Sequence, residues 1–170
     1  MVETAFFFLI ALVAIASAIG MLIARSPVSS ALWLILNFFC IASAYILLGA
    51  EFIGIIQILV YAGAIMVLFL FVIMLLNLDE APRLQNINWI KVVAFTLSVI
   101  VLSQLVFVIA MSVGIVPEVA GGAEAASRLG SAANIGLELF SKYVYHLQII
   151  AVLLLAATIG AVLLAKKRFV

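Results

Sequence analysis

Residues 52–76 read FIGIIQILVYAGAIMVLFLFVIMLL and contain no charged side chain. A helix that crosses the hydrocarbon core of a bilayer needs about 20 successive apolar residues. This stretch meets that requirement, and its strongly polar content is limited to Gln57 and the Tyr61 hydroxyl. Because a helix satisfies its own backbone hydrogen bonds, it can place such a segment in lipid. The stretch therefore predicts a membrane-spanning helix.

Four other runs of the chain are similarly apolar and cover residues 5–24, 28–50, 90–116 and 145–165. Of all 170 residues, 69% are hydrophobic and 9% are charged, and the mean hydropathy is +1.50. A soluble domain is about half apolar and about a quarter charged, and one of this length could not bury so much apolar surface. We therefore predict an all-α membrane protein, a single domain over residues 1–170, with five transmembrane helices.

The segment between the fourth and fifth runs, residues 117–144, has a different composition, rich in Gly, Ala and Ser. We expect it to form a loop outside the membrane. Its second half, residues 131–143, could form a short amphipathic helix at the membrane surface. Tyr143 and Tyr145 would then mark the interface where the last run enters the bilayer.

Basic residues predict the orientation of the chain, because Lys and Arg concentrate on the cytoplasmic side of membrane proteins. With five crossings, Arg128 and Lys142 fall on one side of the membrane. The other six basic residues fall on the opposite side: Arg25, Arg83, Lys91, Lys166, Lys167 and Arg168. We therefore predict that the N-terminus lies outside and the C-terminus lies in the cytoplasm or its topological equivalent.

The sequence offers little material for catalysis. Its ionisable side chains sit near the ends of the runs or between them, whereas an ion carrier usually needs such groups at mid-membrane. The single cysteine, Cys40, and the single histidine, His146, have no partners at metal-ligand spacing. A net charge of +1 gives no basis for nucleic-acid binding. We predict no catalytic, cofactor-binding or metal-binding residue on this chain, which indicates one part of a larger membrane assembly.

Polar side chains within the runs need hydrogen-bond partners in lipid, and we expect neighbouring helices to supply most of them. The residues concerned are Asn37, Ser43, Tyr45, Gln57, Tyr61, Thr96, Ser98, Ser103, Gln104, Gln148 and Thr158.

Residues 52–76 carry a further pattern. At about 100° per residue, Gly54, Gln57 and Tyr61 share one helix face, which Leu68 and Leu75 continue without a polar atom. The central Ala62-Gly63-Ala64 could permit close helix packing, or it could allow a backbone irregularity such as a π-bulge. Spacing alone favours packing.

The chain resembles the subunit J/chain 6 family of respiratory complex I, the proton-pumping NADH:quinone oxidoreductase. The resemblance is carried by residues 49–54 (GAEFIG) and 57–69 (QILVYAGAIMVLF), supported by Ser26-Pro27, residues 74–78 (MLLNL), 135–140 (IGLELF) and 159–162 (IGAV). It covers nearly the whole chain.

The resemblance implies a membrane-arm subunit that couples quinone reduction to proton translocation. In that family the third span carries a π-bulge near Tyr-Ala-Gly that can convert to plain α-helix and gate a water path. The residues then implicated in the gate are Gly54, Gln57, Tyr61, Ala62, Gly63, Ala64, Met66 and Leu68, with Glu51 and Gln148 as polar residues at helix interfaces. Turning the helix by one residue would swing a side chain such as Leu68 by about 100° and move an apolar plug.

Some bacterial members of the family have Glu where this chain has Gln57 and Gln148. A glutamine can orient water but cannot exchange a proton at neutral pH. A role in carrying protons is therefore not expected at these two positions.

The resemblance also implies partners, cofactors and a location. Expected partners are the quinone-site subunit of the chain 1 type, the small subunits A and K, the antiporter-like subunits and membrane lipid. NADH, FMN, iron–sulfur clusters and quinone would belong to other subunits. The bacterial plasma membrane is implied in preference to the mitochondrial inner membrane. Two alternatives stay open: a homologous subunit of a multisubunit cation/proton antiporter or membrane-bound hydrogenase, and a purely structural scaffold.

Overall fold

The computed structural model of the chain describes residues 2–76, 88–112 and 122–166. Every secondary-structure element in these residues is a helix, which confirms the predicted all-α class. Five helical segments in the described part are long and apolar enough to cross a membrane. The chain is therefore a multi-pass membrane protein, as predicted.

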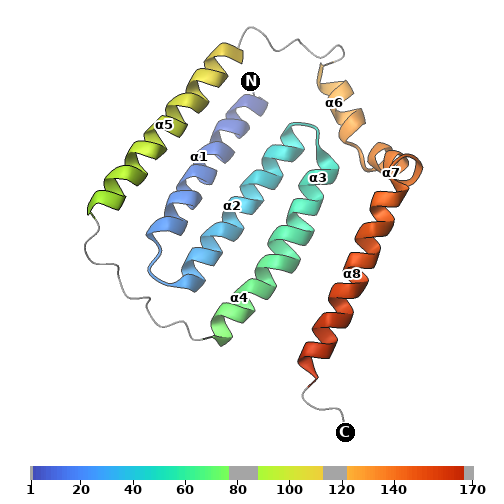
Figure 1. The fold of residues 1–170 in the computed structure, drawn as a ribbon. Coiled ribbons are helices and arrows are strands. Elements are labelled where there is room, and N and C mark those ends of the chain that lie inside the picture. The colour runs from blue at the N-terminus through green and yellow to red at the C-terminus, as the bar shows by residue number, and fades with distance from the viewer. Residues whose placement is uncertain (1, 77–87, 113–121, 167–170) are drawn as a thin grey trace.

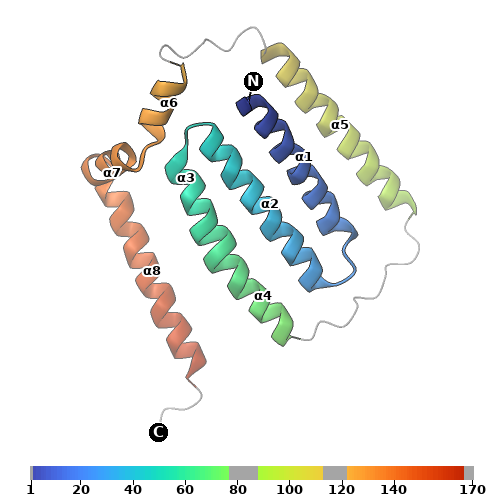
Figure 2. The ribbon, with the colours of Figure 1, turned by 180° about the vertical axis from the view of Figure 1, so that it is seen from behind.

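The spans follow one another up and down (Figures 1 and 2). The first span is α1 (Val2–Ile23) and the second is α2 (Pro27–Leu47). The third consists of α3 (Glu51–Ile56), η1 (Gln57–Ile65) and α4 (Met66–Leu75). The fourth is α5 (Asn88–Ser112), and the last is α8 (Val144–Ala165). Between these two lie the short helices α6 (Gly122–Gly130) and α7 (Ala132–Ser141), where the sequence predicted an outer loop with one short helix.

Local sequence explains the two turns that connect the first three spans. Ser26 caps α2, because its hydroxyl oxygen accepts a hydrogen bond from the Ser29 amide at 3.1 Å, and Pro27 occupies the first helical position. At the other end of α2, Gly49 has a φ of 78°, a conformation that glycine adopts without strain. The amides of Gly49 and Ala50 donate to the carbonyls of Ile46 and Tyr45, which together form a Schellman motif.

Polar atoms and close packing hold α1 against α2. The Asn37 amide donates to the Ala14 carbonyl at 2.8 Å and to the Ser17 hydroxyl at 3.0 Å. Ser17 is fully buried and donates to the same carbonyl. Nearby, an ideal Cβ added to Gly20 would lie 2.7 Å from the Trp33 ring, so the indole packs directly against the α1 backbone. Asn37 thus joins two helices, as predicted for polar side chains in the spans.

Most hydroxyl groups in the spans form hydrogen bonds within their own helix. They donate to carbonyls three or four residues back on their own helix, an arrangement that Ser and Thr side chains make readily. This holds for Ser43, Thr96, Ser98, Ser103 and Thr158. The physical reason is proximity: the preceding turn always offers a carbonyl, whereas α5 and α8 have no described transmembrane helix beside them.

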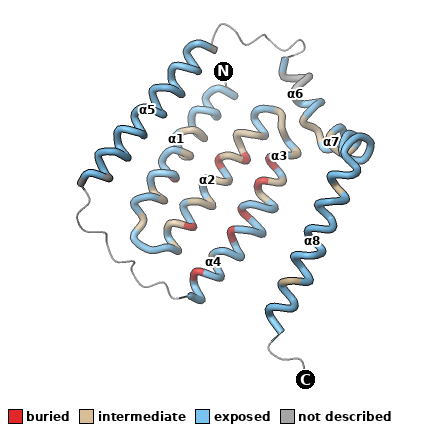
Figure 3. Tube along the Cα trace, in the orientation of Figure 1, coloured by how far each residue is buried: buried red, intermediate tan, exposed pale blue. Residues whose placement is uncertain are grey.

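Among the residues that the structure describes, the buried ones all belong to the first three spans (Figure 3). The core cluster consists of Ala31, Met66 and Ile73, with side chains of α2 and α4 packed around it. Among the described elements, α5 contacts no other helix and α8 contacts only α7. Apart from the half-buried Leu147, the described apolar side chains of both helices are exposed, so lipid or other chains must cover them in a membrane.

The structure shows which basic residues share one end of the helix bundle, but not which end faces the cytoplasm. The α1–α2 turn, the start of α5 and the end of α8 lie at one end of the bundle (Figure 1), and these segments carry Arg25, Lys91 and Lys166. Arg83, Lys167, Arg168 and residues 77–82 and 113–121 lie outside the described residues. Which end faces the cytoplasm stays a prediction.

Candidate functional site

The middle of the third span departs from α-helical geometry. Residues Gln57–Ile65 form a π-helix between two α-helical pieces. At its end the Met66 amide donates to the Tyr61 carbonyl, five residues back instead of four. The prediction of a π-bulge in this span is therefore confirmed.

The π-segment changes which face of the span packs on α2. The buried residues of the span are Gly54, Gln57, Ala62, Met66 and Ile73. Gln57 and Ala62 are five residues apart, which is the spacing of hydrogen-bonded residues in a π-helix. Beyond this point, each buried position lies one residue later than an unbroken α-helix starting from Gln57 would place it.

The predicted face is therefore wrong beyond Gln57. Tyr61, Leu68 and Leu75 are exposed by 46%, 64% and 69%, whereas Ala62 and Met66 are buried. The prediction assumed a constant 100° per residue, and the extra residue taken up by the bulge turns the rest of the span relative to α2. Sequence reasoning thus missed Ile73, and no periodic signal could have revealed it without the bulge.

Gly54 lies where α3 comes closest to α2. An ideal Cβ at this position would be 2.8 Å from Cγ1 of Ile46 and 3.0 Å from the carbonyl oxygen of Ala42. Ala42 is itself fully buried. Only a residue without a side chain permits this approach of two helix backbones, so Gly54 fixes the α-helical start of the span.

Gly63 has a different environment. It is exposed, and the only atom within 4 Å of an ideal Cβ there, outside the helix's nearby backbone, is the Ile58 carbonyl oxygen at 3.2 Å. Ile58 lies five residues back, at the position whose carbonyl a π-helix pairs with the Gly63 amide. Within this chain Gly63 therefore lies on the exposed side of the π-segment, away from the described helices that pack on this span. Ala64, which follows it, is also exposed.

Gln57 and Tyr61 place polar groups on this part of the span. Gln57 is 9% exposed, and no enclosed side-chain nitrogen or oxygen of the described residues is without a hydrogen-bond partner, so an unpaired atom of its amide would reach the surface of the chain. In lipid, an amide without a partner costs several kcal/mol, about 4–8 for full transfer to hydrocarbon, so the site favours a water molecule or a polar group of another chain. The Tyr61 ring contacts Phe38 of α2 edge to face, with centroids 5.9 Å apart.

Met66 and Leu68 both belong to α4 but point in different directions. Met66 is buried in the cluster with Ala31 and Ile73, whereas Leu68 is mostly exposed. The structure therefore brings together Gly54, Gln57, Ala62 and Met66 against α2. It leaves Gly63, Ala64 and Leu68 on the outside of this chain.

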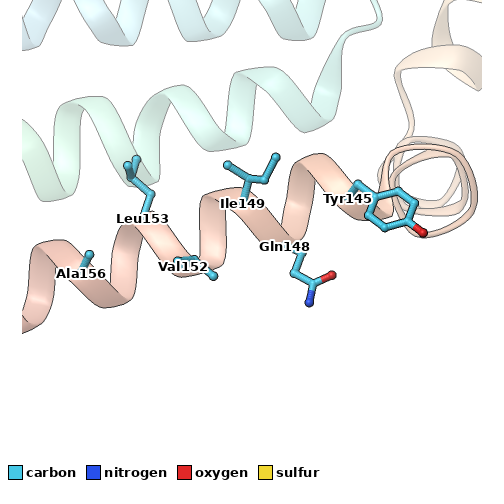
Figure 4. Close-up of a pocket in the computed structure, with 6 residues that line it drawn as sticks. All are labelled: Tyr145, Gln148, Ile149, Val152, Leu153 and Ala156. Carbon is cyan, nitrogen blue, oxygen red and sulfur yellow. The ribbon is translucent and has the colours of Figure 1, made fainter.

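The two outlying polar residues are not part of this cluster. Glu51 is the first residue of α3 and is exposed. Gln148 lies on α8 and lines an open apolar hollow of about 420 Å³ with Tyr145, Ile149, Val152, Leu153 and Ala156. Figure 4 shows the Gln148 amide on the side of α8 that faces away from the third span, whereas Ile149 and Leu153 point towards that span.

Nothing in the described residues suggests a metal centre, because no three His, Cys, Asp or Glu side chains there lie close enough to hold an ion. The absence of metals and cofactors from this chain stays a prediction.

Comparison with known proteins gives a consistent answer. A family model described as NADH-ubiquinone/plastoquinone oxidoreductase chain 6 matches residues 17–164. NADH-quinone oxidoreductase subunit J of Rhodobacter capsulatus is 35% identical over 95% of this chain and 80% of the relative. The subunit J of Pseudomonas aeruginosa is 34% identical over 97% of both chains. The F(420)H(2) dehydrogenase subunit J of Methanosarcina mazei is 36% identical over 96% of this chain and 91% of the relative. The chain therefore belongs to the subunit J/chain 6 family of NADH-quinone oxidoreductases.

Proposed function

We propose that this chain is the membrane-arm subunit of a proton-translocating quinone oxidoreductase in which the third span acts as a conformational gate. The observation that carries the proposal is the π-segment Gln57–Ile65, flanked by α-helix on both sides. A π-segment within an α-helix is uncommon and is often found at functional sites. The chain supplies no catalytic centre of its own, so its role is to couple electron transfer elsewhere to proton movement.

The gate has two registers. In the π register Ala62, Met66 and Ile73 face α2. If the segment converts to α-helix, the buried positions move back by one residue, to Tyr61, Ile65 and Val72, because one residue turns a helix by about 100°. The bulky Tyr61 would then occupy the place of Ala62. Two packings of one sequence that differ by a few kcal/mol make a bistable element.

Such a rotation can open or close a path for water. The Gln57 amide can hold a water molecule in the membrane. Below it, exposed apolar side chains such as Leu68 would swing across the surface as α4 turns. An apolar side chain in a narrow file of water interrupts proton transfer by removing water from the file. No ionisable residue on this span is required.

Membership of the family supports a proposal for the remaining components of the complex. We infer that other membrane-arm subunits cover α5 and α8: the quinone-site subunit, the small subunits A and K, and the antiporter-like subunits. The exposed apolar surfaces of both helices fit this role. NADH, FMN, iron–sulfur clusters and quinone would bind elsewhere in the complex. A bacterial plasma membrane fits relatives such as the subunits J of Rhodobacter capsulatus and Pseudomonas aeruginosa.

The substitution Gly63→Val tests the gate. A side chain at this position would press on the Ile58 carbonyl, which lies 3.2 Å from an ideal Cβ. Its β-branch also restricts the local rotamers. We expect the π register to become costlier by about 1–3 kcal/mol, as in overpacked sites, which would shift the equilibrium between registers about 5- to 150-fold. Quinone-driven proton pumping in membranes, normalised to complex content, should fall more than assembly does.

Leu75→Val provides the matched control on the same span. It places the same β-branched side chain about three turns away, in exchange for an exposed leucine. It should leave pumping close to that of the parent. If the Gly63→Val complex assembles fully and pumps like the parent, the gate is wrong and a purely structural scaffold becomes the better account.

A second candidate concerns the assembly. The relative in Methanosarcina mazei is named as a subunit of an F(420)H(2) dehydrogenase and is as similar to this chain as the NADH-quinone oxidoreductase subunits are. The same type of span could therefore serve a complex with a different electron donor, or a related hydrogenase or cation/proton antiporter. Purifying the intact complex in mild detergent and identifying its subunits distinguishes these assemblies. An NADH-binding subunit in the complex supports the first proposal.

A further inference from the structure

Two hydrogen-bonded turns that are distant in sequence meet beside the N-terminal end of the third span. One is the α2–α3 turn, which contains Gly49 and Ala50 and is closed by its Schellman hydrogen bonds. The other is the kink between α6 and α7 at Gly130. Figures 1 and 2 both place the α6–α7 pair next to the start of α3, and contacts of α3 with both short helices agree with this.

The α6–α7 kink is closed by hydrogen bonds of its own. The carbonyl oxygen of Arg128 accepts three hydrogen bonds: from the Ser131 amide at 3.4 Å, from the Ser131 hydroxyl at 2.9 Å, and from the Asn134 side-chain amide. The Ser131 hydroxyl oxygen also caps α7 by accepting from the Asn134 backbone amide. The kink therefore has a defined shape, and Gly130 lies at its outer surface.

The two turns touch through backbone atoms. An ideal Cβ on Gly130 would overlap the carbonyl oxygen of Gly49 and would lie 2.9 Å from Cα of Ala50. Backbone atoms cannot rotate away as the end of a side chain can, so any residue other than glycine at position 130 must push the turns apart. By contrast, an ideal Cβ on Gly136, in the next helix, meets nothing within 4 Å.

This contact lies within the connection between the two halves of the described chain. Among the described elements, α6 and α7 alone link the later helices to the first three spans, because α5 contacts no helix and α8 contacts only α7. The position of α8 relative to the third span therefore depends on the place where Gly130 meets Gly49.

We propose that Gly130 is a positioning residue for the third span, and that its backbone contact with Gly49 and Ala50 fixes the N-terminal end of that span. Gly54, against the Ala42 carbonyl, fixes the same end from the side of α2. With α3 held at both places, a change of register in η1 turns α4 and leaves α3 where it is. This inference rests on the proposed coupling function.

The test uses the intact complex with Gly130→Ala and Gly130→Val, and Gly136→Ala and Gly136→Val as matched controls in the same pair of helices. The readout is the number of protons pumped per electron transferred, measured together with complex content. A loss of assembly lowers the content but not this ratio. We expect the ratio to fall about fivefold or more for Gly130→Val and less for Gly130→Ala, with both controls close to the parent. Assembled Gly130→Val complex with the parent ratio would overturn the proposal.

A second measurement applies if the Gly130 variants do not assemble. Cysteine pairs Ala50→Cys with Ser131→Cys, and Ala50→Cys with Leu137→Cys, are treated in membranes with a short thiol cross-linker. Residue 137 lies about 9 Å further along α7 than residue 131. The first pair should cross-link several-fold more than the second. Equal or reversed yields would show that the kink does not sit on the α2–α3 turn and would overturn the proposal.

The Gly63→Val result distinguishes this proposal from the one on which it rests. If Gly63→Val uncouples pumping and Gly130→Val does not, the gate stands and the positioning role of Gly130 fails. If Gly63→Val pumps normally, the gate itself fails, whatever Gly130→Val does.

Discussion

At the scale of single residues, the glycines of the third span perform separate tasks. Gly54 lets α3 approach the backbone of α2, whereas Gly63 lies exposed beside a carbonyl of its own π-segment. Both residues are glycines, so their different surroundings decide their different roles. Substitutions at the two positions should therefore fail in different ways, one in stability and the other in coupling.

Gly54→Ala should destabilise the helix pair. The added methyl group meets the Ala42 carbonyl at 3.0 Å, which belongs to a helix backbone that cannot yield locally. We expect a cost of about 1–3 kcal/mol, the usual range for overpacking. The temperature at which the purified complex loses this subunit should fall. Gly136→Ala, where the methyl group has open space in this chain, is the control. Equal midpoints for the two variants would contradict the assigned contact.

Asn37→Leu should weaken the pairing of α1 with α2. The substitution removes donors to the Ala14 carbonyl and the Ser17 hydroxyl. Hydrogen bonds between membrane helices contribute about 0.6–2 kcal/mol, so the loss should be of this size. Ser43→Ala on the same helix removes a bond within α2 only and should change less. Thermal dissociation of the complex measures both, and a larger effect of Ser43→Ala would refute this ranking.

At the scale of the element, the third span makes a register-specific prediction. Ala31 and Ile73 share the buried cluster, whereas Val72 would take the place of Ile73 in an α-helical register. The pair Ala31→Cys with Ile73→Cys should therefore form a disulfide in the π register. The pair Ala31→Cys with Val72→Cys should gain yield only when turnover populates the α register.

The control for these pairs is Ala31→Cys with Phe71→Cys, because Phe71 is 61% exposed and faces away from the cluster in the π register. Disulfide yields are compared in resting membranes and during quinone reduction. Yields that do not change with turnover would argue against an exchange of registers. A high resting yield for residue 72 would contradict the burial pattern itself.

At the scale of the whole molecule, the orientation of the bundle is the open structural prediction. The turn before α2, the start of α5 and the end of α8 share one end and carry Arg25, Lys91 and Lys166. We expect this end to face the cytoplasm, because basic residues favour that side. Single cysteines placed after Ala165 and in the α6–α7 kink should react with an impermeant reagent from opposite sides. A C-terminal cysteine that reacts only from outside would reverse the topology.

Much of this fold follows from local sequence. Five apolar runs of sufficient length specify five spans, because lipid accepts only helices that satisfy their own backbone. Ser26-Pro27 and Gly49 begin and end helices through interactions with residues only a few positions away. The resemblance of residues 57–69 to a known family located the π-segment for the same reason: a bulge is a property of a short stretch of chain.

Tertiary structure decided what periodicity could not. One extra residue in the bulge moved Ala62, Met66 and Ile73 onto α2 in place of Tyr61, Ile65 and Val72, the positions that an unbroken α-helix would bury, since every later side chain turns with it. The need for glycine at position 130 arises from a turn far earlier in the sequence, and only the folded chain brings the Gly49 carbonyl to it.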